Sequence, residues 1–202
     1  MADKGTVFIV SAASGTGKTS LTTALTARND NIQVAVSHTT RKPRENEING
    51  VHYHFVDTAT FEQMIGDGAF IEHANVHGNF YGTSTREVEK IINQGIDVIL
   101  EIDVQGAEQV RRQMPDAVSI FILPPSLEAL KQRLFERGTE DIETLNLRIN
   151  NARLEFEQAS LFDYLVVNDD LPTATQDLMT IVYATRLRQS NNNEALISLL
   201  QN

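Results

Sequence analysis

Four residues near the start of the chain, Gly15, Gly17, Lys18 and Thr19, have the types and spacing of a phosphate-binding loop. Glycines let successive backbone N–H groups turn toward an oxyanion, and the N-terminus of a following helix adds its positive dipole end. The lysine of such a loop reaches the β- and γ-phosphates, and the next hydroxyl binds Mg²⁺. The motif predicts a triphosphate site with Thr19 as metal ligand, formed by Ala12, Ala13, Ser14, Gly15, Thr16, Gly17, Lys18 and Thr19.

Ala12 stands where the pattern G-x-x-x-x-G-K-[ST] has its first glycine. Alanine is acceptable there if the backbone does not need a positive φ at this position. The alternative is a simple strand-to-helix turn with an exposed lysine. An apolar strand over Val7–Val10 and a helix from Lys18 to about Ala27 are the context that the motif requires, so they favour the phosphate loop.

A second group of polar residues lies in the stretch S-H-T-T-R-K-P-R-E-N-E-I-N-G-V-H-Y over 37–53. Arg41 and Arg44 are three residues apart and Tyr53 follows, which suits a phosphate dianion because arginine binds phosphate bidentately. A solvated charged loop explains this stretch equally well when it is taken alone. The phosphate loop upstream favours the reading as a second phosphate site.

Composition narrows the classes of protein to which this chain can belong. The chain has 202 residues, 41% of them hydrophobic, which is enough for one α/β core with small insertions. A net charge of −10 disfavours a polynucleotide partner, and no apolar run is long enough for a membrane span. The absence of cysteine fits a reducing compartment, so we expect a cytoplasmic protein without a membrane partner. The oligomeric state cannot be read from these features.

The order of apolar segments predicts an α/β fold with a parallel sheet flanked by helices. Apolar runs at 98–103, 118–123 and 165–167 alternate with helical patterns, and ligand sites in such sheets lie at the carboxyl ends of the strands. A half-exposed strand is expected over 51–56, and Ser84-Thr85-Arg86-Glu87 has the pattern of a capping box. The segment from 37 to about 95 interrupts the alternation and is interpreted as an inserted β-rich lobe.

Several motifs in one order resemble guanylate kinase, a nucleoside monophosphate kinase. They are S-x-T-T-R-x-x-R-x-x-E-x-x-G-x-x-Y from Ser37, then Gly78–Thr83, Ile102–Gly106, Arg137–Glu140 and Val167–Leu171. The resemblance covers about 5–186 and implies a P-loop NTPase-type sheet with an inserted lobe and a lid. The implied bounds are a core of about 5–36 and 96–186, a GMP-binding lobe of about 37–95, a lid of about 133–150 and a tail of 187–202.

The resemblance also implies the residues that bind GMP. Arg41, Arg44, Tyr53 and Tyr81 hold its phosphate, and Ser37, Glu72, Thr83 and Asp103 surround its guanine; Glu47 and Glu101 complete the predicted set. Guanine presents two adjacent donors, N1–H and the 2-amino group, which one carboxylate such as Glu72 accepts together. Glu101 and Asp103 are two apart on a predicted strand, so both are expected to point into the cleft.

The predicted reaction is in-line transfer of the γ-phosphoryl group of ATP to the phosphate of GMP. GMP is already mostly a dianion at neutral pH, so no catalytic base is needed. The resemblance implies that arginines of a mobile lid close on the phosphates, with Asn168 on the ATP side and Mg²⁺ as cofactor. The predicted catalytic residues are Lys18, Arg41, Arg133, Arg137 and Arg148.

Two rival functions remain open. A guanylate-kinase-like module of a scaffold protein binds phosphorylated peptides without catalysis, but such modules tend to lack the lysine of the phosphate loop, which this chain has as Lys18. A related kinase for another phosphorylated sugar or nucleotide is the second alternative. Such an enzyme would be expected to lack Ser37 or Glu72, both of which are present.

Overall fold

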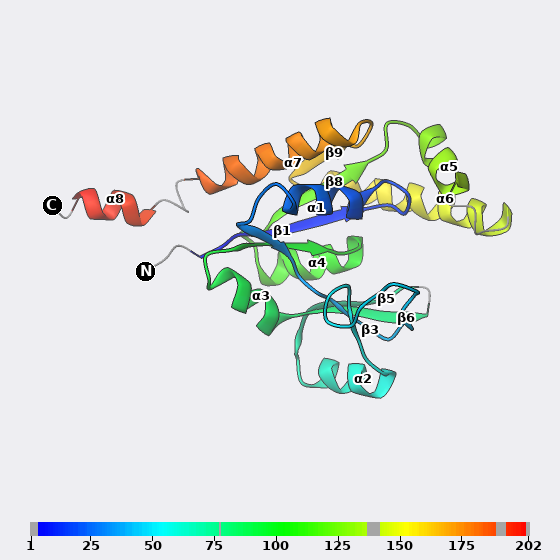
Figure 1. The fold of residues 1–202 in the computed structure, drawn as a ribbon, viewed down its shortest axis with the longest axis horizontal. Helices are drawn as coiled ribbons and strands as arrows, with labels where there is room; N and C mark the ends of the chain where they lie inside the picture. Colours follow the sequence, from blue (N-terminus) through cyan, green and yellow to red (C-terminus); the bar gives the residue numbers. More distant parts are fainter. Residues whose placement is uncertain (1–3, 77, 137–141, 189–192, 201–202) are drawn as a thin grey trace.

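Two β-sheets form the framework of the molecule (Figure 1). The computed structural model describes residues 4–76, 78–136, 142–188 and 193–200. A five-stranded sheet has the order β2-β7-β1-β8-β9, and all its neighbouring strands are parallel. This confirms the predicted α/β fold class. Its strands are β1 (Val7–Ala12), β2 (Ile32–Val34), β7 (Asp97–Glu101), β8 (Val118–Leu123) and β9 (Tyr164–Val167).

Helices cover both faces of this parallel sheet (Figure 1). Because side chains alternate along a strand, Phe8 and Val10 of β1 face one side of the sheet and Val7 and Ile9 face the other. The first side packs against α1 (Lys18–Thr26) and α7 (Leu171–Arg186), and the second against α3 (Thr85–Ile92) and α4 (Val104–Gln113). The site is therefore carried on a sheet that is buried on both faces.

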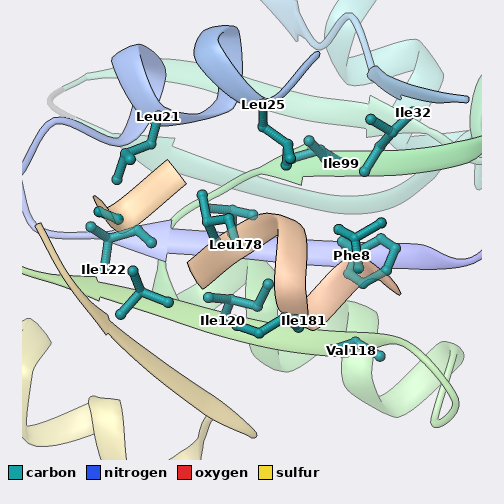
Figure 2. Packing of buried hydrophobic residues seen from close by; sticks show 14 residues of the cluster. Phe8, Leu21, Leu25, Ile32, Ile99, Val118, Ile120, Ile122, Leu178 and Ile181 are labelled. Carbon is teal, nitrogen blue, oxygen red and sulfur yellow. The ribbon is translucent and has the colours of Figure 1, made fainter. Parts of the chain in front are cut away.

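The cluster beneath α1 and α7 is tightly filled by aliphatic side chains. Figure 2 shows Leu21 and Leu25 of α1 and Leu178 of α7 directed at the strands. Leu21 and Leu178 have no exposed surface. Burial of a leucine side chain of this kind stabilises the fold by about 1.5–3 kcal/mol, so α1, which starts at the phosphate loop, is held rigidly on the sheet.

The four-stranded sheet has the order β4-β3-β6-β5 and lies beside the parallel sheet (Figure 1). Phe61 of α2 (Thr58–Gly66) stacks on Phe70 and Phe80, with ring centroids 4.5 and 5.4 Å away, and fixes that helix to the sheet. This sheet thus has a small aromatic core of its own. Its strands are β3 (His38–Thr39), β4 (His54–Phe55), β5 (Phe70–Val76) and β6 (Asn79–Ser84).

Two local predictions in this part of the chain are wrong. The strand expected over 51–56 is reduced to β4, because the backbone N–H groups of Val51 and His52 bond to the Ile48 carbonyl in a turn instead of a ladder. Ser84 precedes α3 as expected, but its side chain makes no capping hydrogen bond. The Glu87 carboxylate lies 3.5 Å from Nε2 of His54 and so does not complete a capping box.

The remaining helices follow in chain order. They are α5 (Leu127–Glu136), α6 (Ile142–Glu157), the short 3₁₀ helix η1 (Gln158–Leu161) and α8 (Asn193–Leu200). Ser126 caps α5 by accepting a hydrogen bond of 3.1 Å from the Ala129 N–H. In Figure 1, α8 lies apart from both sheets near the C-terminus. Within the described residues, none of the helices combines the length and apolar character needed to cross a membrane.

Candidate active site

The phosphate loop connects β1 to α1 and has the backbone shape that its sequence predicts. Gly15 and Gly17 have φ values of 89° and 90°, a conformation that other residues rarely adopt. Ala12 is the last residue of β1 and pairs with Ile122 of β8, so its backbone is extended and needs no glycine. The departure from the motif at Ala12 therefore does not distort the loop.

Two side chains hold this loop in place. The buried hydroxyl of Thr16 donates to the Ala13 carbonyl at 2.9 Å, and Nδ2 of Asn168 donates to the Thr16 carbonyl at 2.7 Å. A Cβ on Gly17 would lie 2.5 Å from Nδ2 of Asn168, so the glycine also makes room for this amide. Asn168 follows β9, which means that the far edge of the sheet supports the loop.

Lys18 and Thr19 turn toward the carboxyl end of β7. Nζ of Lys18 donates to the Ile102 carbonyl at 3.2 Å, and burial lowers the pKa of this amine. The Thr19 hydroxyl donates to Oε2 of Glu101 at 3.1 Å, and the Thr22 hydroxyl donates to Oε1 of the same carboxylate. A hydroxyl and a carboxylate beside a phosphate loop are hard oxygen donors of the kind that suit Mg²⁺.

A cavity of about 600 Å³ opens above the phosphate loop and has room for a nucleotide. The loop itself forms its floor, and Asp103 and Gln105 lie at the start of α4. On the opposite side stand residues of α6, including Arg148, whose Nη1 donates to Oγ of Ser14 at 3.3 Å. The arginine predicted to close on the phosphates thus lies against the loop.

A smaller cavity of about 140 Å³ lies between the two sheets and is lined by Ser37, Tyr53, Glu72, Tyr81, Glu101 and Asp103. Behind it, the hydroxyls of Ser37 and Thr83 are 3.0 Å apart, and Thr83 donates to Oε1 of Glu72 at 2.6 Å. Glu72 is 4% exposed, and burial raises its pKa to about 7. These polar groups form a connected hydrogen-bond network.

The two arginines of the second polar group differ in their surroundings. Arg41 forms a bidentate ion pair with Glu47, with N–O distances of 2.8 and 2.9 Å, and its guanidinium lies 5.5 Å from the ring centroid of Tyr53. The Tyr53 and Tyr81 rings are 6.0 Å apart. Arg44 is exposed, and its backbone N–H donates to Glu47 at 2.7 Å. The Arg41 guanidinium and the rings of Tyr53 and Tyr81 therefore form one group, and Arg44 lies at the edge of this group.

The two cavities adjoin each other, because Val76 and Asp103 line both of them. Asp103 also begins α4, and its carboxylate accepts the Gly106 N–H at 2.8 Å. The phosphate loop and the Glu72 network thus line adjoining cavities. Glu101 lines the smaller cavity as predicted, although its carboxylate is bonded to Thr19 and Thr22 of α1.

The predicted lid arginines are described in part. Arg133 of α5 donates from Nη2 to the Asp169 carbonyl at 3.4 Å and lines a third cavity of about 430 Å³ with Gly15, Gly17 and Asn168. Arg137, with the rest of 137–141, lies outside the described residues. Arg133 and Arg148 therefore stand on two helices beside the same phosphate loop.

Comparison with known proteins identifies the family. The profile described as guanylate kinase matches residues 4–185. The chain belongs to the guanylate kinase family. It is 55% identical to the guanylate kinase of Neisseria gonorrhoeae over 199 residues, covering 98% of this chain and 97% of that protein. It is also 50% identical to the guanylate kinase of Alcanivorax borkumensis over 202 residues, covering 100% and 98% of the two chains.

A solved structure shows the same relationship in three dimensions. The crystal structure of guanylate kinase from Anaplasma phagocytophilum matches with a TM-score of 0.76 at 32% sequence identity. The match covers 92% of this chain and 88% of the other. The arrangement of both sheets in the present chain is therefore that of a guanylate kinase.

Glu155 lies in the candidate active site but was not predicted from the sequence. Glu155 of α6 lines the larger cavity, and burial followed by the charge of Asp103 raises its pKa to about 7, against the effect of Lys18. Its spacing of seven residues from Arg148 places both on one face of α6, which is a signal that the sequence carried. Without knowing that this face meets the phosphate loop, the spacing alone indicates only an amphipathic helix.

Proposed function

We propose that this protein transfers the γ-phosphoryl group of ATP to GMP, and to dGMP, giving ADP and GDP in purine nucleotide metabolism. The position of the two cavities next to each other carries this proposal, because Val76 and Asp103 line both. Phosphoryl transfer requires the two nucleotides to meet end to end, and alignment of the reacting groups supplies much of the catalysis. A phosphopeptide-binding module would need neither the triphosphate loop nor Lys18.

The ATP phosphates occupy the larger cavity in this proposal. Backbone N–H groups from Ala13 to Thr19 cradle them, and Lys18 places its charge between the two nucleotides. The Thr19 hydroxyl would hold Mg²⁺ together with the nucleotide phosphates, with the Glu101 carboxylate nearby, and the metal would supply positive charge to the phosphates. Among the described residues, no group of three or more His, Asp or Glu could hold a metal ion.

GMP occupies the smaller cavity in this proposal. The Glu72 carboxylate accepts N1–H and the 2-amino group of guanine, and the Ser37 hydroxyl, which lines the cavity, is available to the O6 and N7 edge. Thr83 does not line the cavity but donates to Glu72 and contacts Ser37, so it supports both groups. Adenine has an acceptor at N1, so it would leave the buried carboxylate unpaired, and such mispairing is strongly rejected. Asp103 lines the same cavity as Glu72 and is proposed to contact the guanine. The phosphate is held by Arg41, Arg44, Tyr53 and Tyr81 in this proposal.

No side chain needs to remove a proton from the acceptor, because the GMP phosphate is already a dianion near neutral pH. Catalysis comes from alignment and from positive charge placed where the transition state is negative. Lys18, Arg41, Arg133, Arg137 and Arg148 provide that charge in this proposal. The segment 37–95 acts as the GMP lobe and 133–150 as the lid that excludes water, while 5–36 and 96–186 form the core and 187–202 a tail.

A cytoplasmic location is part of the proposal. Both substrates are intracellular nucleotides, and a chain without cysteine suits a reducing compartment. The net charge of −10 further supports small phosphorylated ligands over a polynucleotide. Lys18 and Arg148 bring positive charge to the larger cavity.

A coupled ADP-release assay tests the proposal directly. The protein is given ATP with GMP, dGMP, AMP, CMP or UMP, with and without a chelator of Mg²⁺. We expect turnover with GMP and dGMP alone, abolished by the chelator. Equal turnover of AMP and GMP would refute guanine selection.

The variant Lys18→Met tests the triphosphate site. It should lower kcat by about 10²–10³-fold, since it removes one preorganised charge from the transition state. The matched control is Lys90→Met on α3, an exposed lysine away from both cavities, which should match the wild type. Unchanged turnover by Lys18→Met would refute the assignment of the phosphate loop.

A further inference from the structure

One face of α4 contacts the backbone of β5 on both sides of Glu72. Nε2 of Gln113 donates to the Ile71 carbonyl at 2.6 Å. Gln109 bonds to His73 twice, because its Oε1 accepts the His73 N–H at 3.1 Å and its Nε2 donates to the His73 carbonyl at 2.8 Å. The two glutamines thus bind the residues immediately before and after Glu72.

The strand that they bind needs such partners. β5 is an edge strand, so its outer backbone groups have no neighbouring strand to pair with. The pairing with β6 also shifts between Phe70 and Glu72, which makes Ile71 the extra residue of a β-bulge. Bulges redirect side chains near functional sites. Here the bulge lies directly before the carboxylate that faces the smaller cavity, and Gln113 bonds to its carbonyl.

The same face of α4 also bounds the Glu72 side chain. Gly106, Gln109 and Gln113 are spaced three and four residues apart, so they form one stripe on the helix. A Cβ on Gly106 would lie 2.6 Å from Oε2 of Glu72, so the carboxylate packs against bare helix backbone there. Asp103, the N-cap of this helix, lines both cavities.

We infer that Gln109 and Gln113 are positioning residues for base selection, which hold the β5 backbone so that Glu72 meets the Watson–Crick edge of the acceptor purine. Neither glutamine lines the cavities, so they act through Glu72. This inference rests on the proposed function. It adds that selectivity for guanine depends on a contact between the core helix α4 and the edge strand of the second sheet.

The test uses Gln109→Met and Gln113→Met, which keep the length of the side chain and remove its hydrogen bonds. The matched control, Glu108→Met, breaks the Glu108–Arg112 hydrogen bond on the exposed face of the same helix. KM and kcat are measured for GMP, for IMP, which lacks the 2-amino group, and for ATP. Amide hydrogen exchange at His73 reports the hydrogen bond between the His73 N–H and Gln109 directly, independently of turnover.

Gln109→Met should raise the KM for GMP by about 5- to 30-fold, the value of one to two hydrogen bonds, and narrow the preference for GMP over IMP. The KM for ATP should stay within about twofold of the wild-type value, because Gln109 contacts only the strand that carries Glu72. The His73 amide should exchange faster, because it loses its hydrogen bond to Gln109. Gln113→Met should show the same pattern, more weakly, and Glu108→Met should match the wild type.

Three outcomes separate the inference from the function on which it rests. If the wild type does not phosphorylate GMP, the proposed function fails. If the wild type does so and Gln109→Met keeps its KM for GMP and its GMP-to-IMP preference, the positioning role is refuted. If Gln109→Met lowers the melting temperature and alters the KM and kcat values for ATP and GMP together, the role of Gln109 is merely structural and the positioning role is also refuted. If Gln109→Met does not fold, Gln113→Met tests the inference independently.

Discussion

Arg41 and Glu47 hold each other through two hydrogen bonds of 2.9 and 2.8 Å in the part of the chain proposed to receive the GMP phosphate. The Lys42 carbonyl accepts another bond, of 2.8 Å, from Nη1 of the same guanidinium. Three of the five N–H donors of Arg41 are thereby engaged, which fixes the plane of the guanidinium before a ligand arrives. Hydrogen bonding to Arg41 lowers the pKa of Glu47 to about 2, so the pair stays charged at neutral pH.

Glu47→Gln should therefore weaken GMP binding. The amide accepts with one oxygen and places an NH₂ group against the guanidinium, so Arg41 loses its fixed orientation. We expect the KM for GMP to rise about tenfold with the KM for ATP unchanged, as measured by steady-state kinetics. A lower KM for GMP would contradict this, because it would mean that repulsion between Glu47 and the phosphate outweighs the orientation of Arg41.

Guanine binding should depend on the ionisation of Glu72. Its pKa of about 7 means that the carboxyl is protonated below neutral pH, and a protonated carboxyl cannot accept both guanine donors. The KM for GMP should therefore fall as the pH rises from about 6 to about 8. The second ionisation of the GMP phosphate, near 6, acts in the same sense.

Glu72→Gln separates these two ionisations. The variant should bind GMP more weakly at every pH and lose the pH dependence near 7, leaving that of the phosphate. A wild-type pH profile that matches the variant in shape would show that Glu72 does not titrate in the free enzyme.

Gly106→Ala should damage the guanine site without unfolding the protein. The new Cβ would meet Oε2 of Glu72 at 2.6 Å and Cβ of Ile102 at 3.3 Å, so the buried carboxylate must move. We expect kcat/KM for GMP to fall by at least about tenfold, while ATP affinity measured by calorimetry is preserved. The control is Gly66→Ala at the end of α2, where a Cβ meets nothing within 4 Å. Equal kinetics for the two variants would contradict the tight approach of α4 to Glu72.

Asn168→Ala should loosen the phosphate loop from behind. The change leaves the buried Thr16 carbonyl without its partner at 2.7 Å, which costs about 1–3 kcal/mol and lowers Tm by roughly 2–10 °C. The KM for ATP should rise more than the KM for GMP, since the loop is proposed to bind the triphosphate and not GMP. Thermal melting and kinetics of Asn93→Ala, an exposed residue at the end of α3, serve as the reference. A wild-type Tm for Asn168→Ala would show that the loop holds its shape alone.

Much of the fold follows from local patterns in the sequence. The apolar run at 118–123 forms β8 with the predicted bounds, and α1 begins at Lys18 as the motif requires. Such features depend on residues close together in the chain. The prediction of a strand over 51–56 was wrong. The alternation of apolar and polar residues does not reveal that the backbone N–H groups of Val51 and His52 form hydrogen bonds in a turn.

The supports of the site were harder to predict than the residues that line it. Arg41 and Glu47 are six residues apart, so their motif could be read directly. Gln109 lies 36 residues from His73, and nothing in the local pattern indicates that α4 meets the edge of β5. Glu155 likewise belongs to an ordinary amphipathic pattern until α6 is placed above the phosphate loop.

The amino-acid sequence by itself determined the phosphate loop, the succession of strands and helices, and the polar residue types that are proposed to surround a guanine. Each of these rests on short-range geometry or on side-chain chemistry. The tertiary structure decided which groups face one another. Glu101, predicted to face the acceptor nucleotide, bonds to Thr19 and Thr22 about 80 residues earlier in the chain. The direction of the Glu101 side chain at the end of β7 depends on which element packs beside it. That element is α1, which follows β1, and the parallel pairing of β1 and β7 places it there.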